Sequence, residues 1–220
     1  MGLQGKRILI TAGPTWVAID SVRVISNIAT GKTGILLARK ALSYGARVTL
    51  LLGAGAGVCA LSGNQAKGAR FNKMLRVVRF RFFDELKNIL SRELKKNAYD
   101  IVIHSAAVSD FKAKSKSKAK LSSGREHILK LVPLEKLAVL IRCLASEALL
   151  IMFKLESGIT DKALIQRAKN AREKNRADLI IANRLNPYRA YIIDRNGIQT
   201  YVGNKKELSE KLIKQLAAFN

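Results

Sequence analysis

Hydrophobic residues fall into two alternating patterns along the chain: short continuous runs and longer stretches with helical spacing. The short runs are rich in β-branched residues and several end at glycine, as residues 7–12 end at Gly13. The longer stretches place apolar side chains on one helical face, as in residues 83–96. The pattern predicts strands at 7–12, 47–52, 76–80, 100–107, 148–153 and 178–182, and helices at 32–44, 83–96, 134–146, 160–175 and 205–219.

Near the C-terminus the pattern changes. Two apolar runs, 190–194 and 198–202, flank the pair Asn196 and Gly197. An Asn-Gly turn between two such runs predicts a β-hairpin, which adds antiparallel strands. The strand–helix alternation before it predicts a parallel sheet covered on both faces. We therefore expect a single domain, residues 1–220, with a Rossmann-like doubly wound α/β fold, a mostly parallel sheet and a small antiparallel β extension.

The expected fold also predicts where a ligand would bind. In doubly wound sheets ligands lie at the carboxyl ends of the strands. The segments that follow Ala12, Leu52 and Ala107 should therefore form the site.

Charge is the unusual feature of the composition. The 220 residues include 40 Lys and Arg against 16 Asp and Glu, a net charge of +24. Such a chain attracts nucleic acid, anionic membrane surfaces or triphosphates, and a compositional bias without function would look the same. Aromatic residues make up only 6% and none lies within the lysine-rich loop, so base-stacking platforms are missing. Nucleic acid is therefore not expected as a partner.

Metal, disulfide and membrane chemistry find little support. Cys59 and Cys143 are far apart, without a neighbouring Cys or His at metal spacing, which favours a reducing cytoplasm and no structural zinc. His104 lies inside an apolar run and is expected to be a core histidine. The N-terminus lacks the apolar core of a signal peptide, and no apolar run reaches membrane-spanning length.

Two nucleotide motifs can be rejected. Gly31-Lys32-Thr33 looks like the end of a P-loop, but Ser26 stands where the first glycine is needed. What remains is a helix start whose free N–H groups can hold an anion. The turn at Gly13 lacks a full dinucleotide fingerprint, and no acidic residue follows Leu52 to bind a ribose. A dehydrogenase is disfavoured.

Residues 112–126 form the most basic stretch, with lysines at alternate positions from 112 to 120. A solvated, mobile loop is one interpretation. The other is a flap that closes its lysines over phosphates, and the two are compatible because a flap is mobile when empty. We expect this flap to be mobile in the free protein and ordered with nucleotide bound.

Segments in order along nearly the whole chain resemble the phosphopantothenoylcysteine synthetase family. The similar segments are residues 11–15, 19–27, 31–34, 106–111, 129–133, 153–156 and 177–183. The resemblance implies a ligase that joins L-cysteine to 4′-phosphopantothenate in coenzyme A biosynthesis. CTP or ATP with Mg²⁺ would activate the carboxylate as an acyl-nucleotide, and the cysteine amine would then attack it. The family is often fused to a flavin-dependent decarboxylase, and only the synthetase half is expected here, without flavin.

The resemblance also implies roles for residues near the substrates. Asn27 would contact the pantothenate carboxylate and the acyl intermediate, and Ala107 would line the same site. Arg23 would support that segment or bind an anion. Asp20 resembles a residue that reaches the substrate of a partner subunit, which implies a homodimer.

Nucleotide contacts are implied in the same way. A flap lysine would neutralise phosphate charge, with Lys120 the first choice and Lys118 the alternative register. The other implied nucleotide contacts are Gly13, Thr15, Ala106, Asp110, Phe153, Lys169 and Lys174.

Three segments depart from the family pattern. Pro14 replaces a glycine and so removes a backbone donor. Ala29 and Thr30 replace a serine pair, and the lysines expected before Ala177 are displaced to Lys169 and Lys174. A basic nucleic-acid-binding module and an inactive structural relative therefore stay as alternatives to the ligase.

Overall fold

The computed structural model describes residues 2–56, 73–197 and 199–219, so Cys59 and Ile198 lie outside it. Within these residues the main sheet has the strand order β12-β11-β10-β9-β6-β1-β4-β5. Its pairs from β10 to β5 are parallel, and the β10–β11 and β11–β12 pairs are antiparallel. The strands are β1 (Arg7–Ala12), β4 (Arg47–Gly53), β5 (Leu75–Phe80), β6 (Ile101–His104), β9 (Leu149–Leu155), β10 (Leu179–Leu185), β11 (Tyr188–Ile193) and β12 (Gln199–Val202). The predicted fold class is confirmed.

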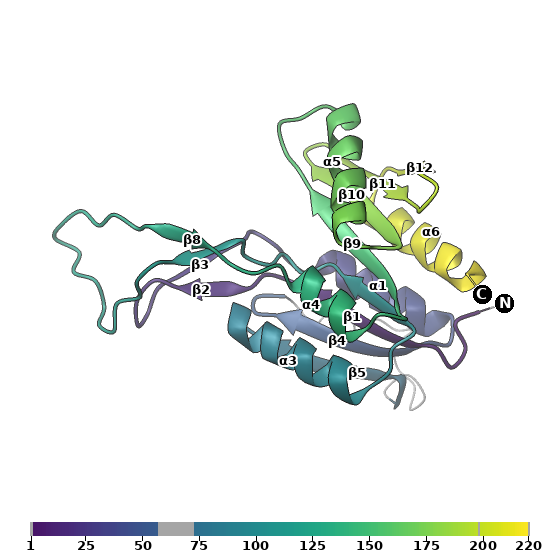
Figure 1. Ribbon diagram of the computed structural model, residues 1–220, viewed down its shortest axis with the longest axis horizontal. Coiled ribbons are helices and arrows are strands. Elements are labelled where there is room, and N and C mark those ends of the chain that lie inside the picture. Colours follow the sequence, from purple (N-terminus) through teal and green to yellow (C-terminus); the bar gives the residue numbers. More distant parts are fainter. Residues whose placement is uncertain (1, 57–72, 198, 220) are drawn as a thin grey trace.

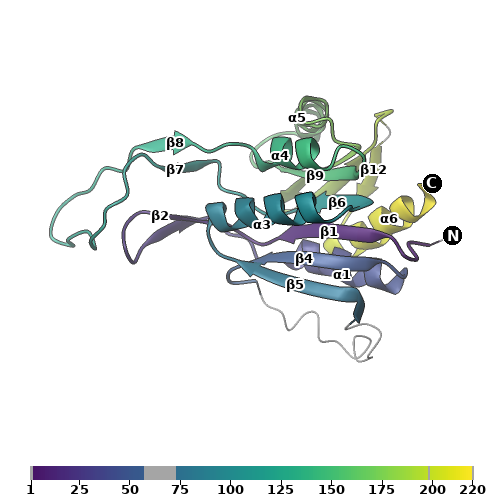
Figure 2. The same ribbon diagram turned by 60° about the horizontal axis from the view of Figure 1, so that its bottom comes forward.

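Helices cover both faces of this sheet (Figures 1 and 2). The helices are α1 (Lys32–Ser43), α3 (Phe83–Lys96), α4 (Leu137–Leu144), α5 (Asp161–Lys174) and α6 (Lys205–Ala218). α1 and α6 pack on one face, and α3, α4 and α5 pack on the other. Ile8 and Ile10 of β1 face the first layer and Leu9 faces the second, and all three are fully buried. Burial on both faces explains why β1 is a continuous apolar run.

The direction of the helices fixes what lies at each end of the strands. A helix between parallel strands starts where the preceding strand ends and returns antiparallel to it. Thr160 caps α5 by accepting a hydrogen bond from Ala163 N–H, and Asn204 caps α6 in the same way. We call the edge where β1, β4, β6, β9 and β10 end the carboxyl edge, and the opposite one the amino edge.

An arm projects beyond the main sheet at the carboxyl edge (Figure 1). It consists of residues 16–26 and 111–133. β2 (Trp16–Ala18) pairs antiparallel with β3 (Val24–Ser26), and β7 (Phe111–Ala113) with β8 (Leu131–Pro133). β7 lies against β2. The sequence pattern did not predict these short strands, and the loop expected at 112–126 includes the last two residues of β7.

Several predicted boundaries also differ. The strand expected at 100–107 ends at His104, and the helix expected at 134–146 begins at Leu137. After His104 the chain leaves the sheet and runs beside the turn that follows β1. Ala107 N–H donates to Gly13 O at 2.9 Å, and Thr15 N–H donates to Ala107 O at 3.3 Å.

Candidate functional site

Close packing around glycine shapes the carboxyl edge. Gly13 follows β1 with φ 83°, and a Cβ there would lie 3.1 Å from Gly53 N. A Cβ at Gly34 would overlap the Cβ of Ala12. The first turn of α1 therefore rests directly on the end of β1, and the turns after β1 and β4 touch. Glycine, whose side chain is a single hydrogen atom, allows these backbone segments to come so close, and larger side chains would not.

Thr15 and Asn27 brace the segment that follows β6. Buried Thr15 accepts a hydrogen bond from Ser109 N–H at its Oγ1, at 2.9 Å. The exposed Asn27 amide donates to Ala107 O at 3.0 Å and to Val108 O at 3.3 Å. Asn27 Oδ1 accepts no hydrogen bond from the residues that the structure describes. The structure thus brings Gly13, Thr15, Asn27, Ala106 and Ala107 together, as the strand ends predicted.

Thr11, which sequence reasoning missed, supports the segment that follows β6 from its position near the end of β1. Thr11 Oγ1 accepts a hydrogen bond from Ala106 N–H at 3.2 Å and lies 2.9 Å from His104 Nδ1. Burial lowers the pKa of His104 to about 4, so the ring is neutral at pH 7 and Nδ1 can accept the threonine proton. His104 is therefore a supporting core residue. Thr11 is the one polar residue in the buried run 8–12 of β1, which is the signal that could have found it.

Asp20 has a different environment from the one expected. Its carboxylate is buried in the β2–β3 turn and accepts hydrogen bonds from Val22 N–H at 2.8 Å, Arg23 N–H at 2.7 Å and Leu121 N–H at 3.0 Å. The Arg23 guanidinium adds a salt bridge at 2.6 Å. The Leu121 bond, with those from Val22 and Arg23, holds the pKa of Asp20 well below its usual range against the opposing effect of burial. All four lone-pair positions are occupied, which leaves none for a substrate.

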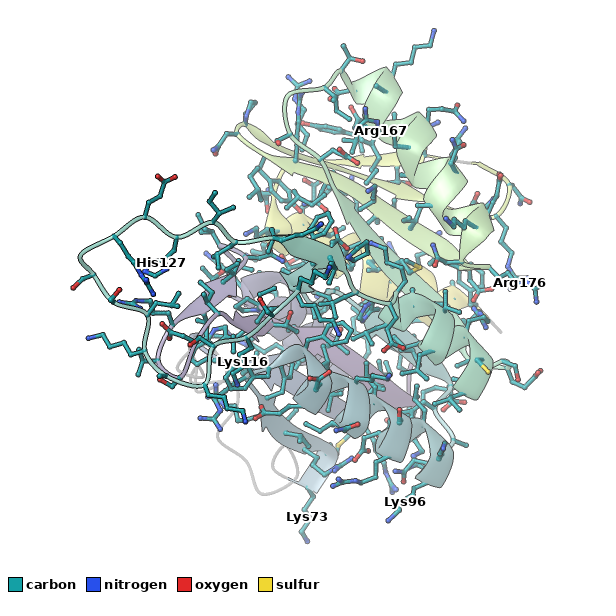
Figure 3. The ribbon with its side chains drawn as sticks, turned by 60° about the vertical axis from the view of Figure 1, so that its left-hand side comes forward. Lys73, Lys96, Lys116, His127, Arg167 and Arg176 are labelled. Atoms are coloured by element: carbon teal, nitrogen blue, oxygen red, sulfur yellow. The ribbon has the colours of Figure 1, made fainter. Side chains whose placement is uncertain are left out.

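The basic loop is fastened to the same turn. Ser117 N–H donates to Ile19 O at 3.1 Å, four residues before the Leu121 bond. Lys118 and Lys120 lie between these two anchors and are exposed. Figure 3 shows Lys116 and His127 on this loop, far from Arg176 and Lys96 on the other side of the molecule.

Two expected nucleotide contacts lie around the cluster. Asp110 is exposed and forms a salt bridge with Lys136, a residue that sequence reasoning did not select. Phe153 lies near the end of β9, partly buried against the α1/α6 layer. Lys136 immediately precedes α4, and its pairing with Asp110 depends on tertiary structure.

Lys169 and Lys174 are not part of this cluster. Because α5 runs antiparallel to the strands, its C-terminal half lies toward the amino edge. Lys169 Nζ lies 3.4 Å from the position of a Cβ on Gly197, in the β11–β12 turn. Lys174 lines a cavity of about 570 Å³ with Arg142 and Asp178, at the start of β10. The assignment of these lysines to the triphosphate site is not supported within one chain.

Within the described ranges, no three His, Cys, Asp or Glu side chains gather in a way that could hold a metal ion. Of the helices in those ranges, none is long and apolar enough to cross a membrane.

These features define a doubly wound α/β protein whose candidate site is built from the turns after β1, β4 and β6. Residues 3–219 match the family described as DNA/pantothenate metabolism flavoprotein C-terminal domain. The chain is 35% identical over 186 residues to the coenzyme A biosynthesis bifunctional protein CoaBC of Thermococcus kodakarensis. The chain belongs to this family, the phosphopantothenoylcysteine synthetase family. The alignment covers 84% of this chain and 43% of the Thermococcus protein, so the chain spans less than half of that relative.

Solved structures show the same fold. The DNA/pantothenate metabolism flavoprotein from Streptococcus pneumoniae superposes with a TM-score of 0.83 at 27% identity, covering 98% of this chain and all of that one. A Cab2 variant in complex with phosphopantothenate-cysteine superposes with a TM-score of 0.75 at 19% identity, covering 96% of this chain and 86% of that one.

Proposed function

We propose that this protein is a phosphopantothenate–cysteine ligase of coenzyme A biosynthesis. The observation that carries the proposal is the cluster of Asn27, Gly13, Thr15 and Ala107 at the carboxyl edge, in a chain of the synthetase family. The Cab2 relative, whose structure contains phosphopantothenate-cysteine, is consistent with small-molecule substrates. We place the protein in the cytoplasm, because the proposed substrates are free cysteine, which needs a reducing compartment, and a nucleoside triphosphate.

The proposed reaction has two steps. A carboxylate oxygen of 4′-phosphopantothenate attacks the α-phosphorus of the triphosphate, and pyrophosphate leaves. The cysteine amine then attacks the acyl carbonyl, an amide bond forms, and the nucleoside monophosphate leaves. Both partners in the first step are anions, so positioning and charge neutralisation should carry the catalysis. The Asn27 amide is uncharged and so does not repel the carboxylate, but its N–H donors would have to exchange Ala107 O and Val108 O for the substrate. Lys120 or Lys118 can neutralise phosphate charge.

The triphosphate would be CTP or ATP, accompanied by Mg²⁺. Magnesium commonly binds through one or two carboxylates together with substrate phosphates, so a protein cage is not required. Asp110 is the carboxylate that the cluster offers, and it is exposed. It would have to exchange Lys136 for the ion.

We also propose a homodimer joined through the arm. Large apolar side chains are exposed there, among them Val22 at 65%, Phe111 at 51% and Ile128 at 90% exposure. Apolar side chains gathered on one projecting element are typical of a protein interface. Sedimentation should give a dimer at assay concentrations, and a fully active monomer would contradict the proposal.

The ligase itself is tested by pyrophosphate release. Phosphopantothenate with CTP or with ATP should release pyrophosphate, and added cysteine should then give phosphopantothenoylcysteine. Omission of phosphopantothenate is the control for simple triphosphate hydrolysis. No release with either nucleotide, together with salt-sensitive binding of RNA or DNA, would favour the nucleic-acid-binding alternative.

A further inference from the structure

The Asp20 carboxylate joins two parts of the arm that are distant in sequence. Two of its four hydrogen bonds close its own turn, through Val22 N–H and Arg23 N–H to Oδ1. The other two, from Arg23 Nη1 and Leu121 N–H, reach Oδ2. Arg23 Nη1 also donates to Leu121 O at 3.1 Å. Leu121 is thus held at both its N–H and its C=O, across 101 positions of sequence.

The segment held in this way carries both candidate lysines. Ser117 N–H is bonded to Ile19 O, and Ser117 Oγ donates to Ala119 O at 2.6 Å. Residues 117–121 therefore form a small turn that is anchored at its two ends. Beyond it, residues 122–130 are all exposed.

The charges explain why such an anchor is needed. Lys118 and Lys120 repel each other and the lysines before them, and the exposed turn buries too little apolar surface to offset its ordering entropy. The Asp20 carboxylate, whose charge is paired with Arg23, offsets this cost through its hydrogen bond from Leu121 N–H. It does so without forming an ion pair with either lysine, so both ammonium groups remain available to an anionic ligand.

We propose that Asp20 is a positioning residue for the flap lysines. Through Arg23 and the backbone of Leu121, it fixes the turn 117–121 to the β2–β3 hairpin. The lysines then move with the hairpin as one unit, and independent motion is confined to residues 122–130. This inference rests on the proposed ligase only for the chemical role of the lysines, since the anchoring itself is a property of the free protein.

Asp20→Asn is the discriminating variant. Asparagine keeps one oxygen that can accept from Val22 and Arg23, so the β2–β3 turn is retained. Its amide NH₂ would face the Leu121 N–H and the Arg23 guanidinium, and donors facing donors cannot form hydrogen bonds. The matched control is Asp100→Asn, which alters a carboxylate at the amino edge that accepts from Arg7 N–H at 2.8 Å and pairs with Lys6.

Hydrogen exchange tests the anchoring without reference to catalysis. In Asp20→Asn, the amides of 117–121 should exchange about tenfold faster or more, as expected for the loss of one hydrogen bond to a charged group. In Asp100→Asn their exchange should be unchanged. Unchanged protection in Asp20→Asn would overturn the proposal, whether or not the protein is a ligase.

A double-mutant cycle tests the positioning role. Asp20→Asn should lower kcat about tenfold or more, with the KM for phosphopantothenate nearly unchanged, because the lysine is misplaced and the substrate contacts are intact. Combined with Lys120→Gln or Lys118→Gln, whichever single variant is damaging, it should cause little further loss. Additive losses or a large rise in KM would instead make Asp20 an independent contributor to substrate binding. Absence of product from the unmodified protein would refute the ligase and leave the exchange result to decide the anchoring.

Discussion

The two edges of the sheet are both basic, and they use their charges in opposite ways. At the amino edge two acids are buried and paired: Asp178 accepts from Arg142 at 2.8 Å and from Leu150 N–H at 2.6 Å, and Glu93 is bonded to Arg76 and to the Tyr99 hydroxyl. Charges held in this way stabilise the scaffold.

At the carboxyl edge, the polar groups that could meet a ligand are exposed and only partly engaged. Asn27 has an unused oxygen, and Lys118 and Lys120 have no ion pair with any residue in the described part of the chain. Net charge therefore does not locate the site in a chain of +24. Whether the charged and polar side chains have partners does locate it. Three substitutions test this contrast between the edges.

The largest effect is expected from Asn27→Ala at the carboxyl edge. In the proposed ligase Asn27 contacts the reacting carboxylate, so loss of its amide should lower phosphopantothenoylcysteine formation about a thousandfold, as for other groups that stabilise developing charge. Circular dichroism and the melting temperature should stay close to those of the unmodified protein, because Asn27 is exposed. Asn170→Ala, an exposed asparagine on α5, is the control. Near-normal synthesis by Asn27→Ala would remove this residue from the mechanism.

At the amino edge, Asp178→Ala should change stability and not chemistry. It leaves Arg142, whose side chain is only 16% exposed, without its buried partner. Breaking a buried pair from one side costs about 3–5 kcal/mol of unfolding free energy, measurable by urea denaturation. Glu210→Ala, an exposed acid on α6, should stay within about 0.5 kcal/mol. If Asp178→Ala lowers the kcat of fully folded protein, the division between the edges fails.

A smaller, pH-dependent effect is expected from His104, which supports the site from within the core. Its folded pKa of about 4 lies below the ordinary histidine pKa of 6.5, so the unfolded chain takes up the proton first as the pH falls. Its contribution to stability is therefore complete above pH 6.5 and should decrease by about 2 kcal/mol between pH 7 and pH 5. His104→Asn, which keeps an acceptor for Thr11, should flatten that slope. A slope in His104→Asn equal to that of the unmodified protein would contradict the assignment.

The centre of the main sheet could be predicted because its strands are buried on both faces. The predicted runs that became β1, β4, β9 and β10 are mostly apolar, as burial on both faces requires, whereas the edge strand β5 contains Arg76 and Arg79 and is buried only at Phe80. The arm could not be predicted in this way. Its strands are three residues long and partly exposed, so neither alternation nor continuous hydrophobicity marks them.

The candidate site was predictable in part for the same reason. Gly13, Thr15 and Ala107 meet because parallel strands end at one edge, a rule that needs only the strand order. Lys169 and Lys174 fell outside because their position depends on how far along an antiparallel helix they lie. The bond from Leu121 to Asp20 has no sequence signal, since every residue except proline carries the same N–H.

The arm also has a consequence for how the chain folds. Its two halves are separated in sequence by the strands and helices from α1 to β6, so β7 can reach β2 only after a long loop has closed. The entropy cost of closing this loop is offset only once the contacts between β7 and β2 have formed. Pairing of the two halves of the arm is therefore slow. The central sheet should therefore form before the arm matures. During synthesis, the hairpin of β2 and β3 would lack its partner strands β7 and β8 until residues 111–133 emerge from the ribosome.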